Sequence, residues 1–549
     1  MPDRAERCQP DRRRAADGAR VDAVNPGPVL ANAVWLASGI ADARRFRAAL
    51  AEPAQAQARW LRAHLARHAR SEFGIRHDFA GMDDIAAFVQ RVPVVEYTDL
   101  AADMQRIADG EPDVLACGPV THLAPTSGST GGRKLIPFNS ALAAAFSAAV
   151  SPWMFDLVRQ RPRLIGGPAY WSISPLSEPE QTPDRKQPST VPTDFADDAD
   201  YLGGPRAWLV RHALAVPSSV RFASDAESFW RITLLALLRQ RDLRLISVWH
   251  PSFLELLTGA AEQAWPELLD AVKSGSNPWR KALPESARQD FEGQPDSQRA
   301  AELTRVGPGD SPAWWPALQV VSCWGEQAAE PGWRKLVRRL PHVLVQPKGL
   351  LATECVVTIP FGGEQPLAIT SHFFEFIDES GELRFAHQLE RGRNYEVVVT
   401  NGGGLWRYRL GDVVECTGAV AATPSLRFVG RARVSDLRGE KLSEAFVADV
   451  LRDLWAADER PSFATLRARD RNGAAGYELV VPEDLDSSGS AIVQRLETAL
   501  CANPHYALAR RLGQLAEVAV VTVPASAPLM ELQASPGRIG DVKPRVLAP

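Results

Sequence analysis

Beyond residue 120, short runs of β-branched and apolar residues alternate with longer segments that have the spacing of helices. Each run is bounded by polar or turn-forming residues, which is typical of buried strands. Strands that alternate with helices predict an α/β architecture. The expected strands are Arg244–Trp249, Leu318–Trp324, His342–Gln346, Leu367–Ser371 and Tyr395–Thr400.

The segments between these strands predict one interior helix and two long excursions. Glu227–Gln240 is apolar on several sides, so we expect it to be an interior helix. Residues 31–120 are mainly helical in pattern. Ser177–Tyr201 and Lys273–Pro312 are rich in polar and turn-forming residues, which predicts surface excursions.

The chain has 549 residues, too many for one hydrophobic core. Residues 1–25 are polar and rich in arginine, which predicts a flexible tail. Residues 26–430 are expected to form a large domain of several parts, and residues 431–549 a small α+β domain. The elements expected in the small domain are helices at Leu442–Ala456 and Ala491–Cys501, and strands at Tyr477–Pro482 and Ala516–Val523.

The composition is that of an ordinary globular protein. Lysine and arginine number 62 against 66 aspartates and glutamates, a net charge of −4, which argues against a nucleic-acid partner. The six cysteines include no CxxC pair, so a reducing compartment fits best. We find no signal peptide, and we expect no stretch apolar enough to span a membrane. These features predict a cytoplasmic protein without a membrane partner.

Two histidines lie four residues apart in a segment with helical spacing. His64 and His68 share one face with Trp60, Leu61 and Leu65. The spacing suits a metal, but the glutamate of an HExxH motif is missing. We therefore interpret the pair as part of a partly buried helix face.

The segment from Pro125 to Pro137 has the most specific chemistry of the chain. Four hydroxyl side chains and three glycines lie in seven consecutive positions and are followed by Arg133 and Lys134. Glycines let backbone N–H groups approach an anion closely, which favours a phosphate-binding loop. The loop is not a Walker A motif, because Leu135 follows the lysine. A plain turn between two strands is the alternative.

Two carboxylates stand in comparably unusual places. Glu354 lies in the otherwise apolar stretch Gly349–Cys355, where a carboxylate needs a cation or a metal-bound phosphate as its partner. Asp412 closes the stretch Gly404–Asp412, in which we expect a strand to end in a glycine turn. It could accept hydrogen bonds from the vicinal hydroxyls of a ribose. An ordinary salt bridge and an ordinary turn are the alternatives.

Taken together, the three motifs resemble the Gretchen Hagen family of acyl-acid amido synthetases, which belongs to the adenylate-forming superfamily. The segment Thr126–Pro137 is similar to the family's nucleotide loop, and Tyr408–Asp412 matches its tyrosine-arginine-x-glycine-aspartate signature. Val92–Tyr97 and Ile107–Glu111 are similar to the lead-in to that loop. The chain departs from the plant members at Leu351–Glu354, where they have a serine-serine-glutamate or similar motif.

The resemblance implies roles for individual residues. The loop would hold the ATP phosphates, Asp412 would bind the ribose hydroxyls, and Glu354 would hold Mg²⁺. The resemblance also implies that Phe428–Arg431 is a hinge before a mobile C-terminal domain, which delivers catalytic lysines. The implied catalytic residues are Lys543, Glu354 and Lys441, and the implied nucleotide-binding residues are Ser127, Gly128, Ser129, Thr130, Gly131, Lys134, Thr353, Asp412 and Arg431.

The implied reaction activates a carboxylic acid as an acyl adenylate, with ATP and Mg²⁺, and releases pyrophosphate. An amine, expected to be an amino acid, then displaces AMP and gives an amide. An acyl-CoA ligase would share the first step and use a thiol acceptor. A nucleotide-binding protein with a decayed site is a further alternative, against which the joint presence of Glu354, Asp412, Lys441 and Lys543 argues.

Overall fold

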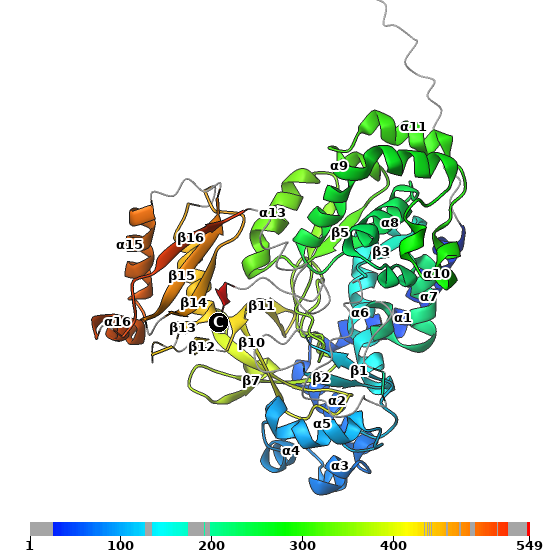
Figure 1. The fold of residues 1–549 in the computed structure, drawn as a ribbon. Coiled ribbons are helices and arrows are strands. Elements are labelled where there is room, and N and C mark those ends of the chain that lie inside the picture. Colours follow the sequence, from blue (N-terminus) through cyan, green and yellow to red (C-terminus); the bar gives the residue numbers. More distant parts are fainter. Residues whose placement is uncertain are drawn as a thin grey trace, which may run out of the picture.

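The computed structural model describes most of the chain (Figure 1). The described residues are 26–126, 134–173, 191–192, 198–432, 434–435, 437–438, 440, 442–456, 459–471, 474–483, 489–512, 514–524 and 546–548. The predicted tail at 1–25 and most of the predicted excursion at 177–201 therefore lie outside the described residues.

Residues 26–108 are mainly helical, as the spacing predicts. Ser71 begins one of these helices by accepting a hydrogen bond from the backbone N–H of Gly74, at 3.0 Å. The helices are α1 (Pro26–Ala49), α2 (Pro53–His68), α3 (Glu72–Arg76), α4 (Ile85–Arg91) and α5 (Ala101–Ala108).

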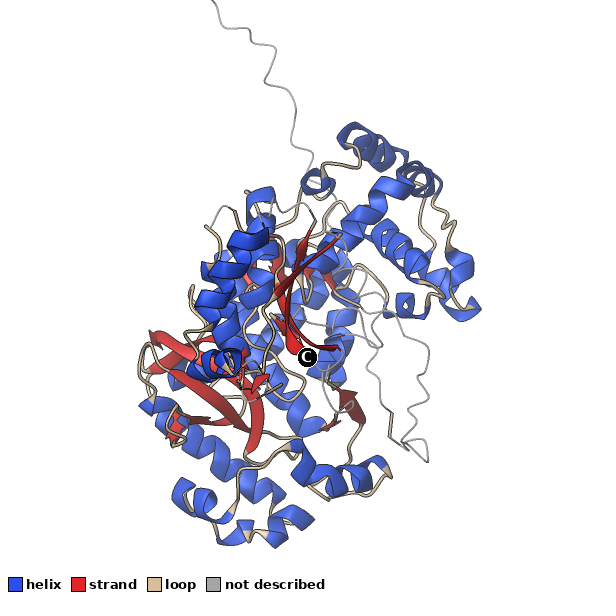
Figure 2. Ribbon diagram, turned by 60° about the vertical axis from the view of Figure 1, so that its left-hand side comes forward, coloured by secondary structure: helices blue, strands red, loops and turns tan. Residues whose placement is uncertain are grey.

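A parallel four-stranded sheet forms the centre of the large domain, and helices flank it (Figure 2). Its order is β3 (Ala169–Trp171), β4 (Leu245–Ser247), β5 (Val320–Cys323) and β6 (Leu344–Pro347). Three of the predicted strands are thereby confirmed. The helices of this region are α6 (Ser140–Gln160), α7 (Gly204–Ala213), α8 (Ala226–Leu238), α9 (Pro251–Ser274) and α13 (Glu330–Arg339).

The two faces of this sheet belong to different hydrophobic cores. Leu245 and Val320 pack into the core that includes α1 and α6. Ile246 and Val321 pack into a second core with α8 and α9. Strands buried on both faces explain why their sequences are continuously apolar. The predicted interior helix at 227–240 is confirmed as α8.

The polar segment 273–312 lies largely at the surface, as predicted, but it forms short helices rather than an irregular excursion. It contains α10 (Glu285–Arg288), α11 (Ser297–Val306) and α12 (Ser311–Trp314). Arg299 is buried and donates hydrogen bonds to the carbonyl oxygens of Leu238, at 2.8 Å, and Trp314, at 2.5 Å. Most polar residues of the segment are exposed, and the buried Arg299 joins its short helices to the rest of the domain.

A second, antiparallel sheet follows the parallel one. Its order is β11 (Thr423–Arg431), β10 (Tyr408–Val420), β9 (Asn394–Thr400), β7 (Phe373–Ile377) and β8 (Leu383–Phe385). The predicted strand at 395–400 is confirmed as β9. The predicted strand at 367–371 is wrong, because Ile369 and Ser371 turn back onto the carbonyl oxygens of Leu367 and Ala368.

The C-terminal unit has its own sheet and its own core. Both predicted helices and both predicted strands of this unit are confirmed. β11 contacts α14, which places the unit beside the end of the antiparallel sheet (Figure 1). The elements are β12 (Val434–Ser435), β13 (Leu442–Ser443), α14 (Glu444–Asp453), β14 (Thr465–Arg471), β15 (Ala474–Pro482), α15 (Gly489–Leu500), α16 (Pro504–Arg511), β16 (Ala519–Val523) and β17 (Leu547–Ala548).

Helix α6 corrects the expectation about apolar stretches. Ser140–Gln160 is long and apolar enough to cross a membrane by length and composition alone. However, 78% of its apolar window is buried inside the fold. Its side chains pack against α1 and the first core, which is why it is apolar around most of its circumference.

The two histidines of α2 belong to a buried cluster with a third, His372. The backbone N–H of Cys117 donates to Nδ1 of His68 at 2.9 Å, and that of Val356 donates to Nε2 of His372 at 3.2 Å. Burial lowers the pKa of His372 to about 3 and, together with the charge of Arg67, that of His68 to about 4. The helix-face interpretation of His64 and His68 is confirmed by this packing.

This cluster predicts a loss of stability in acid. The folded protein keeps both imidazoles neutral, whereas an unfolded histidine takes up a proton below about pH 6.5. Each group therefore costs up to about 1.4 kcal/mol of stability per pH unit as the pH falls from there toward the folded pKa. Calorimetric melting at about pH 7 and about pH 5 should show a smaller loss for His372→Gln than for the wild type. The exposed His387→Gln should match the wild type; equal losses in all three proteins would exclude the cluster as the cause.

Candidate nucleotide site

The predicted phosphate loop joins two paired strands. β1 (His122–Pro125) and β2 (Leu135–Phe138) are antiparallel, with Pro125 opposite Leu135. The backbone N–H of Thr126 donates to the carbonyl of Lys134 at 2.9 Å and closes the base of the loop. The predicted ligands Ser127, Gly128, Ser129, Thr130 and Gly131 lie outside the described residues.

Two tyrosines fix Lys134 at the base of the loop. Its Nζ donates a hydrogen bond to the Tyr408 hydroxyl at 3.0 Å. The same nitrogen lies 5.6 Å from the ring centre of Tyr97 and 5.7 Å from that of Tyr408, within cation–π range. The hydroxyl of Tyr97 accepts a hydrogen bond from the backbone of Leu135 at 2.9 Å. Both tyrosines therefore hold the cation and the strand that carries it.

Glu354 lies in a tight turn that follows β6. Leu351 and Val356 form an antiparallel bridge, and the N–H of Ala352 donates to the carbonyl of Cys355 at 2.9 Å. This places the half-buried Thr353 and the buried Glu354 at the tip of the turn.

The electrostatic surroundings of Glu354 show which residues meet there. Burial raises the pKa of Glu354, and the charge of Asp412 raises it further, whereas Lys134 and Arg431 oppose the shift. Separate motifs predicted Lys134, Asp412 and Arg431, and the charges of all three act on the Glu354 carboxylate.

Asp412 occupies a bulge rather than a terminal turn. The pairing of β10 with β9 is interrupted between Arg409 and Val413, and Gly411 has a φ of +79°. A residue with a side chain is strained at such a φ, which explains the glycine. Asp412 is buried, with Oδ1 3.5 Å from Nε of Arg431. The expectation that the strand ends here is wrong, because β10 continues to Val420.

The loop before β10 contains positioning groups that the sequence analysis missed. Asn401 is fully buried, and its Nδ2 donates to the backbone oxygen of Glu354 at 2.7 Å. Arg407 has a φ of +48° and donates to both carboxylate oxygens of the buried Glu375, each at 2.8 Å. The cluster of glycines before Trp406 indicates a loop with an unusual backbone conformation. Nothing in this sequence identifies the ion pair between Arg407 and Glu375.

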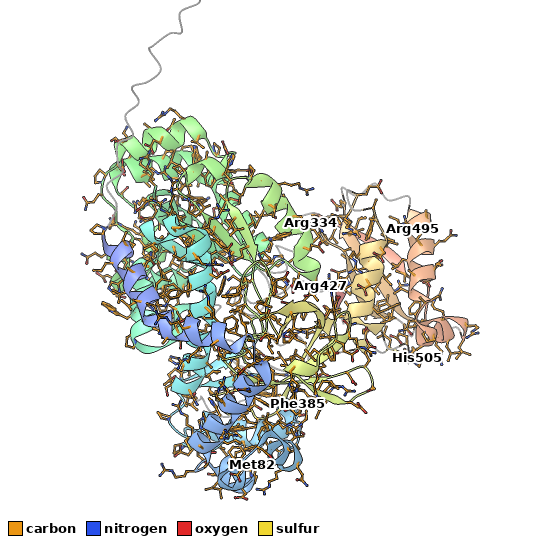
Figure 3. All side chains as sticks on the ribbon, turned by 180° about the vertical axis from the view of Figure 1, so that it is seen from behind. Met82, Arg334, Phe385, Arg427, Arg495 and His505 are labelled. Atoms are coloured by element: carbon orange, nitrogen blue, oxygen red, sulfur yellow. The ribbon has the colours of Figure 1, made fainter. Side chains whose placement is uncertain are left out.

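The C-terminal unit approaches this site from the end of β11. The pKa of Arg427 is raised chiefly by its hydrogen bond to Glu415, with contributions from Glu326 and from Asp449 of α14. Figure 3 shows Arg427 and Arg334 on the side of the large domain nearest to the C-terminal unit. The predicted catalytic residues Lys441 and Lys543 belong to this unit and lie outside the described residues.

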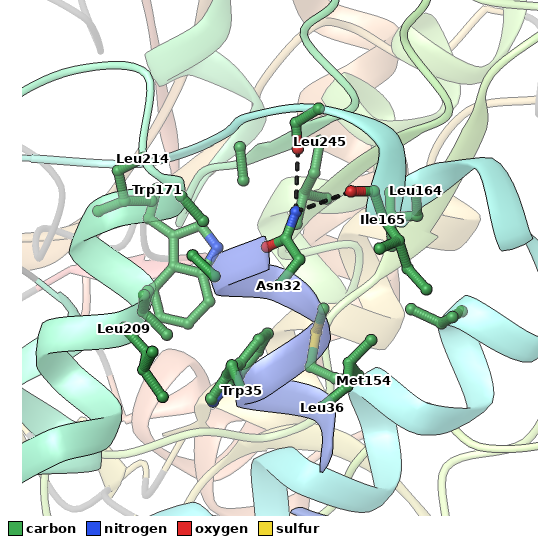
Figure 4. Close-up of a pocket in the computed structure, with 16 residues that line it drawn as sticks. Asn32, Trp35, Leu36, Met154, Leu164, Ile165, Trp171, Leu209, Leu214 and Leu245 are labelled. Atoms are coloured by element: carbon green, nitrogen blue, oxygen red, sulfur yellow. Dashed lines mark hydrogen bonds between the residues drawn. The ribbon is translucent and has the colours of Figure 1, made fainter. Parts of the chain in front are cut away.

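An apolar cavity elsewhere in the large domain is separate from these residues (Figure 4). It is lined by α1, α6 and α7, by the segment from Leu164 to Gly167, and by Ala169 and Trp171 of β3 and Leu245 of β4. Asn32 donates hydrogen bonds to the carbonyl oxygens of Ile165, at 3.2 Å, and Gly167, at 3.0 Å. None of the residues that line this cavity belongs to the group formed by Lys134, Glu354, Asp412 and Arg431.

The site can bind an anion beside a divalent cation. Lys134 and Arg431 supply positive charge at the base of a glycine-rich loop, and Glu354 and Asp412 supply carboxylate oxygens. Among the residues described, no group of three or more His, Cys, Asp or Glu side chains could hold a metal ion. One or two carboxylates together with substrate phosphates are what Mg²⁺ requires, so the set fits a metal that arrives with a nucleotide.

The fold is that of a solved acyl acid amido synthetase structure. A solved structure described as "AtGH3.15 acyl acid amido synthetase in complex with 2,4-DB" superposes with a TM-score of 0.77, at 20% identity, over 93% of this chain and 94% of that one. The GH3 family N-terminal domain matches residues 42–344, and the GH3 family central domain matches residues 365–431. The chain belongs to the GH3 family, as the motifs indicated.

Curated relatives are similar over most of their length. A probable indole-3-acetic acid-amido synthetase, GH3.4, from Oryza sativa subsp. japonica is 27% identical over 448 residues, covering 71% of this chain and 67% of the relative. The indole-3-acetic acid-amido synthetase GH3.3 of Arabidopsis thaliana is 26% identical, covering 71% of this chain and 69% of the relative.

Proposed function

We propose that the protein is an ATP-dependent, AMP-forming acyl-acid amido synthetase. The observation that carries this proposal is the convergence of Lys134, Glu354, Asp412 and Arg431 at the base of the glycine-rich loop. The names of the relatives support the same reaction class. We also propose that the protein acts in the cytoplasm, in accordance with its composition.

The proposed reaction has two steps. A carboxylate oxygen of the acid attacks the α-phosphorus of ATP. The bond between the α-phosphorus and the oxygen that bridges it to the β-phosphorus breaks, and pyrophosphate leaves with that oxygen. The nitrogen of an amino acid then attacks the acyl carbonyl, AMP leaves with the bridging oxygen, and the nitrogen loses a proton. Negative charge develops on phosphate oxygens in the first step, and fixed cations stabilise it.

The described residues fit defined parts of this chemistry. Lys134 is held by Tyr97 and Tyr408 where phosphates would enter the loop. Asp412 would accept hydrogen bonds from the ribose hydroxyls, and Arg431 would hold its carboxylate in place. Glu354 would hold Mg²⁺, which when bound supplies positive charge to the phosphates.

The remaining assignments complete the proposal. Ser127, Gly128, Ser129, Thr130 and Gly131 would contact the phosphates, and Thr353 would contact the nucleotide beside Glu354. Lys441 and Lys543 would reach the nucleotide from the C-terminal unit.

A screen of acids and acceptors tests the proposed function. Pyrophosphate release from ATP should depend on an acid, in a library that includes indole-3-acetate, benzoate and fatty acids. Amino acids should then raise turnover and give an amide. Coenzyme A as the effective acceptor would assign the chain to the acyl-CoA ligases instead, and no acid-dependent release with any acid would contradict the proposal.

A further inference from the structure

The apolar cavity lined by α1, α6 and α7 has the dimensions of a small-molecule site (Figure 4). The space between its walls, with the open mouth included, is about 500 Å³. Pockets that bind small molecules are typically about 300–1,000 Å³ and mostly apolar, with a few polar groups that orient the ligand. Among the described residues that line this cavity, none is charged. The cavity therefore suits an uncharged ligand.

Two hydrogen-bonding groups in the wall of the cavity have no partner among the described residues. Nδ2 of Asn32 donates to the carbonyl oxygens of Ile165 and Gly167, which leaves Oδ1 on the opposite side of the amide. Figure 4 shows that this oxygen and the indole nitrogen of Trp171 point toward one another. An acceptor and a donor thus face the same space, and each lacks a hydrogen bond that a ligand could supply.

One hydroxyl group satisfies both of these groups. A hydroxyl donates one hydrogen and also offers lone pairs as acceptors. It can therefore donate to Oδ1 of Asn32 and accept from Nε1 of Trp171. Trp35 adds an aromatic surface beside them, because its ring centre lies 6.1 Å from that of Trp171 and the two ring planes meet at 73°. A flat ring can pack against Trp35 in edge-to-face or offset geometry.

We propose that this cavity binds a small, uncharged aromatic compound with one hydroxyl group, such as a phenol. The ring would pack against Trp35 and the aliphatic walls, and the hydroxyl would lie between Asn32 and the edge of Trp171. A carboxylate does not suit this cavity, because its charge would be buried without a cation. The ligand is therefore neither the acid nor the amino acid of the proposed reaction, and the inference does not depend on that reaction.

Calorimetric titration with phenol and toluene tests the role of the hydroxyl. The two probes have nearly the same size and shape, and the hydroxyl of phenol replaces the methyl group of toluene. Phenol should bind the full-length wild-type protein at least as tightly as toluene, although water solvates phenol better. Trp171→Phe removes the indole N–H and keeps an aromatic ring. It should lower the ratio of phenol affinity to toluene affinity about 3- to 10-fold, the effect of one lost hydrogen bond.

A second variant tests where the probes bind. Leu209 is half-buried in the cavity wall, so the larger ring of Leu209→Trp should fill the cavity and weaken binding of both probes more than about tenfold. The neighbouring Trp208 is 58% exposed and does not line the cavity. Trp208→Leu is therefore the matched control and should bind both probes as the wild type does.

Three results would overturn the proposal. These are a wild type that does not bind phenol, binding that survives Leu209→Trp in folded protein, and an affinity ratio that Trp171→Phe leaves unchanged. If a melting curve shows that Leu209→Trp does not fold, the ratio in Trp171→Phe decides. All titrations are made without ATP or an acid, so a failure of the proposed synthetase activity would not change their outcome.

Discussion

Glu354→Gln is expected to reduce the rate of adenylate formation at least about 100-fold, the scale of effect that follows the loss of one preorganised charge-stabilising group. The substitution keeps the size of the side chain and removes the charge that the proposed Mg²⁺ site requires. The cause is local, because Asn401 holds the backbone oxygen of Glu354, and glutamine leaves that hydrogen bond in place. Single-turnover pyrophosphate release over a range of Mg²⁺ concentrations measures the effect.

The nearby Glu364 supplies the control for this variant. Glu364 lies exposed in a turn ten residues further along, so Glu364→Gln should behave as the wild type. Glu354→Gln with normal turnover and normal Mg²⁺ dependence would show that Glu354 has only a structural role.

Arg407→Met is expected to destabilise the large domain by about 3–5 kcal/mol, because it leaves the Glu375 carboxylate buried without its partner. Arg407 also donates hydrogen bonds to the carbonyl oxygens of Val89 and Val92, at 2.8 and 2.5 Å. The variant therefore releases the segment before Tyr97 together with the start of β10. Thermal unfolding by calorimetry should show a transition several degrees lower, with weaker ATP binding as Tyr408 loses its fixed position.

Two further variants isolate the buried charge as the cause. Arg407→Met combined with Glu375→Met should recover much of the lost stability, because the double variant removes both charges. Arg409→Met breaks a half-exposed pair with Glu396 and should cost less than about 1 kcal/mol. If the double variant melts as low as Arg407→Met alone, the unpaired charge is not what destabilises the domain.

The sequence analysis predicts the strands that carry runs of buried apolar residues. It fails where a polar side chain is packed inside the fold or where an apolar segment turns back on itself. Strands β4 and β5 are buried along their whole length, and β6 and β9 contain buried runs of apolar residues, so their pattern leaves little choice. The helices of segment 273–312 were not predicted, and the inward guanidinium of Arg299 finds backbone acceptors that composition does not reveal. The segment 367–371 is apolar, but only its start bridges to neighbouring strands, and its backbone then turns back on itself.

The residues of the candidate site also fall into those that the sequence predicts and those that it does not. Lys134, Glu354, Asp412 and Arg431 could be predicted because each belongs to a short motif whose chemistry is local. Asn401 and Arg407 could not, because their importance depends on contacts between segments that are distant in sequence. Arg407 meets Glu375, for example, across the sheet from β10 to β7.

The path of one oxygen atom tests the central claim most directly. An acid labelled with ¹⁸O in its carboxylate is incubated with ATP, Mg²⁺ and an amino acid, and the products are analysed by mass spectrometry. Adenylation followed by aminolysis predicts unlabelled pyrophosphate and one ¹⁸O atom in AMP, because the bridging carboxylate oxygen leaves with the nucleotide. Label in inorganic phosphate, with ADP as the other product, would contradict the account.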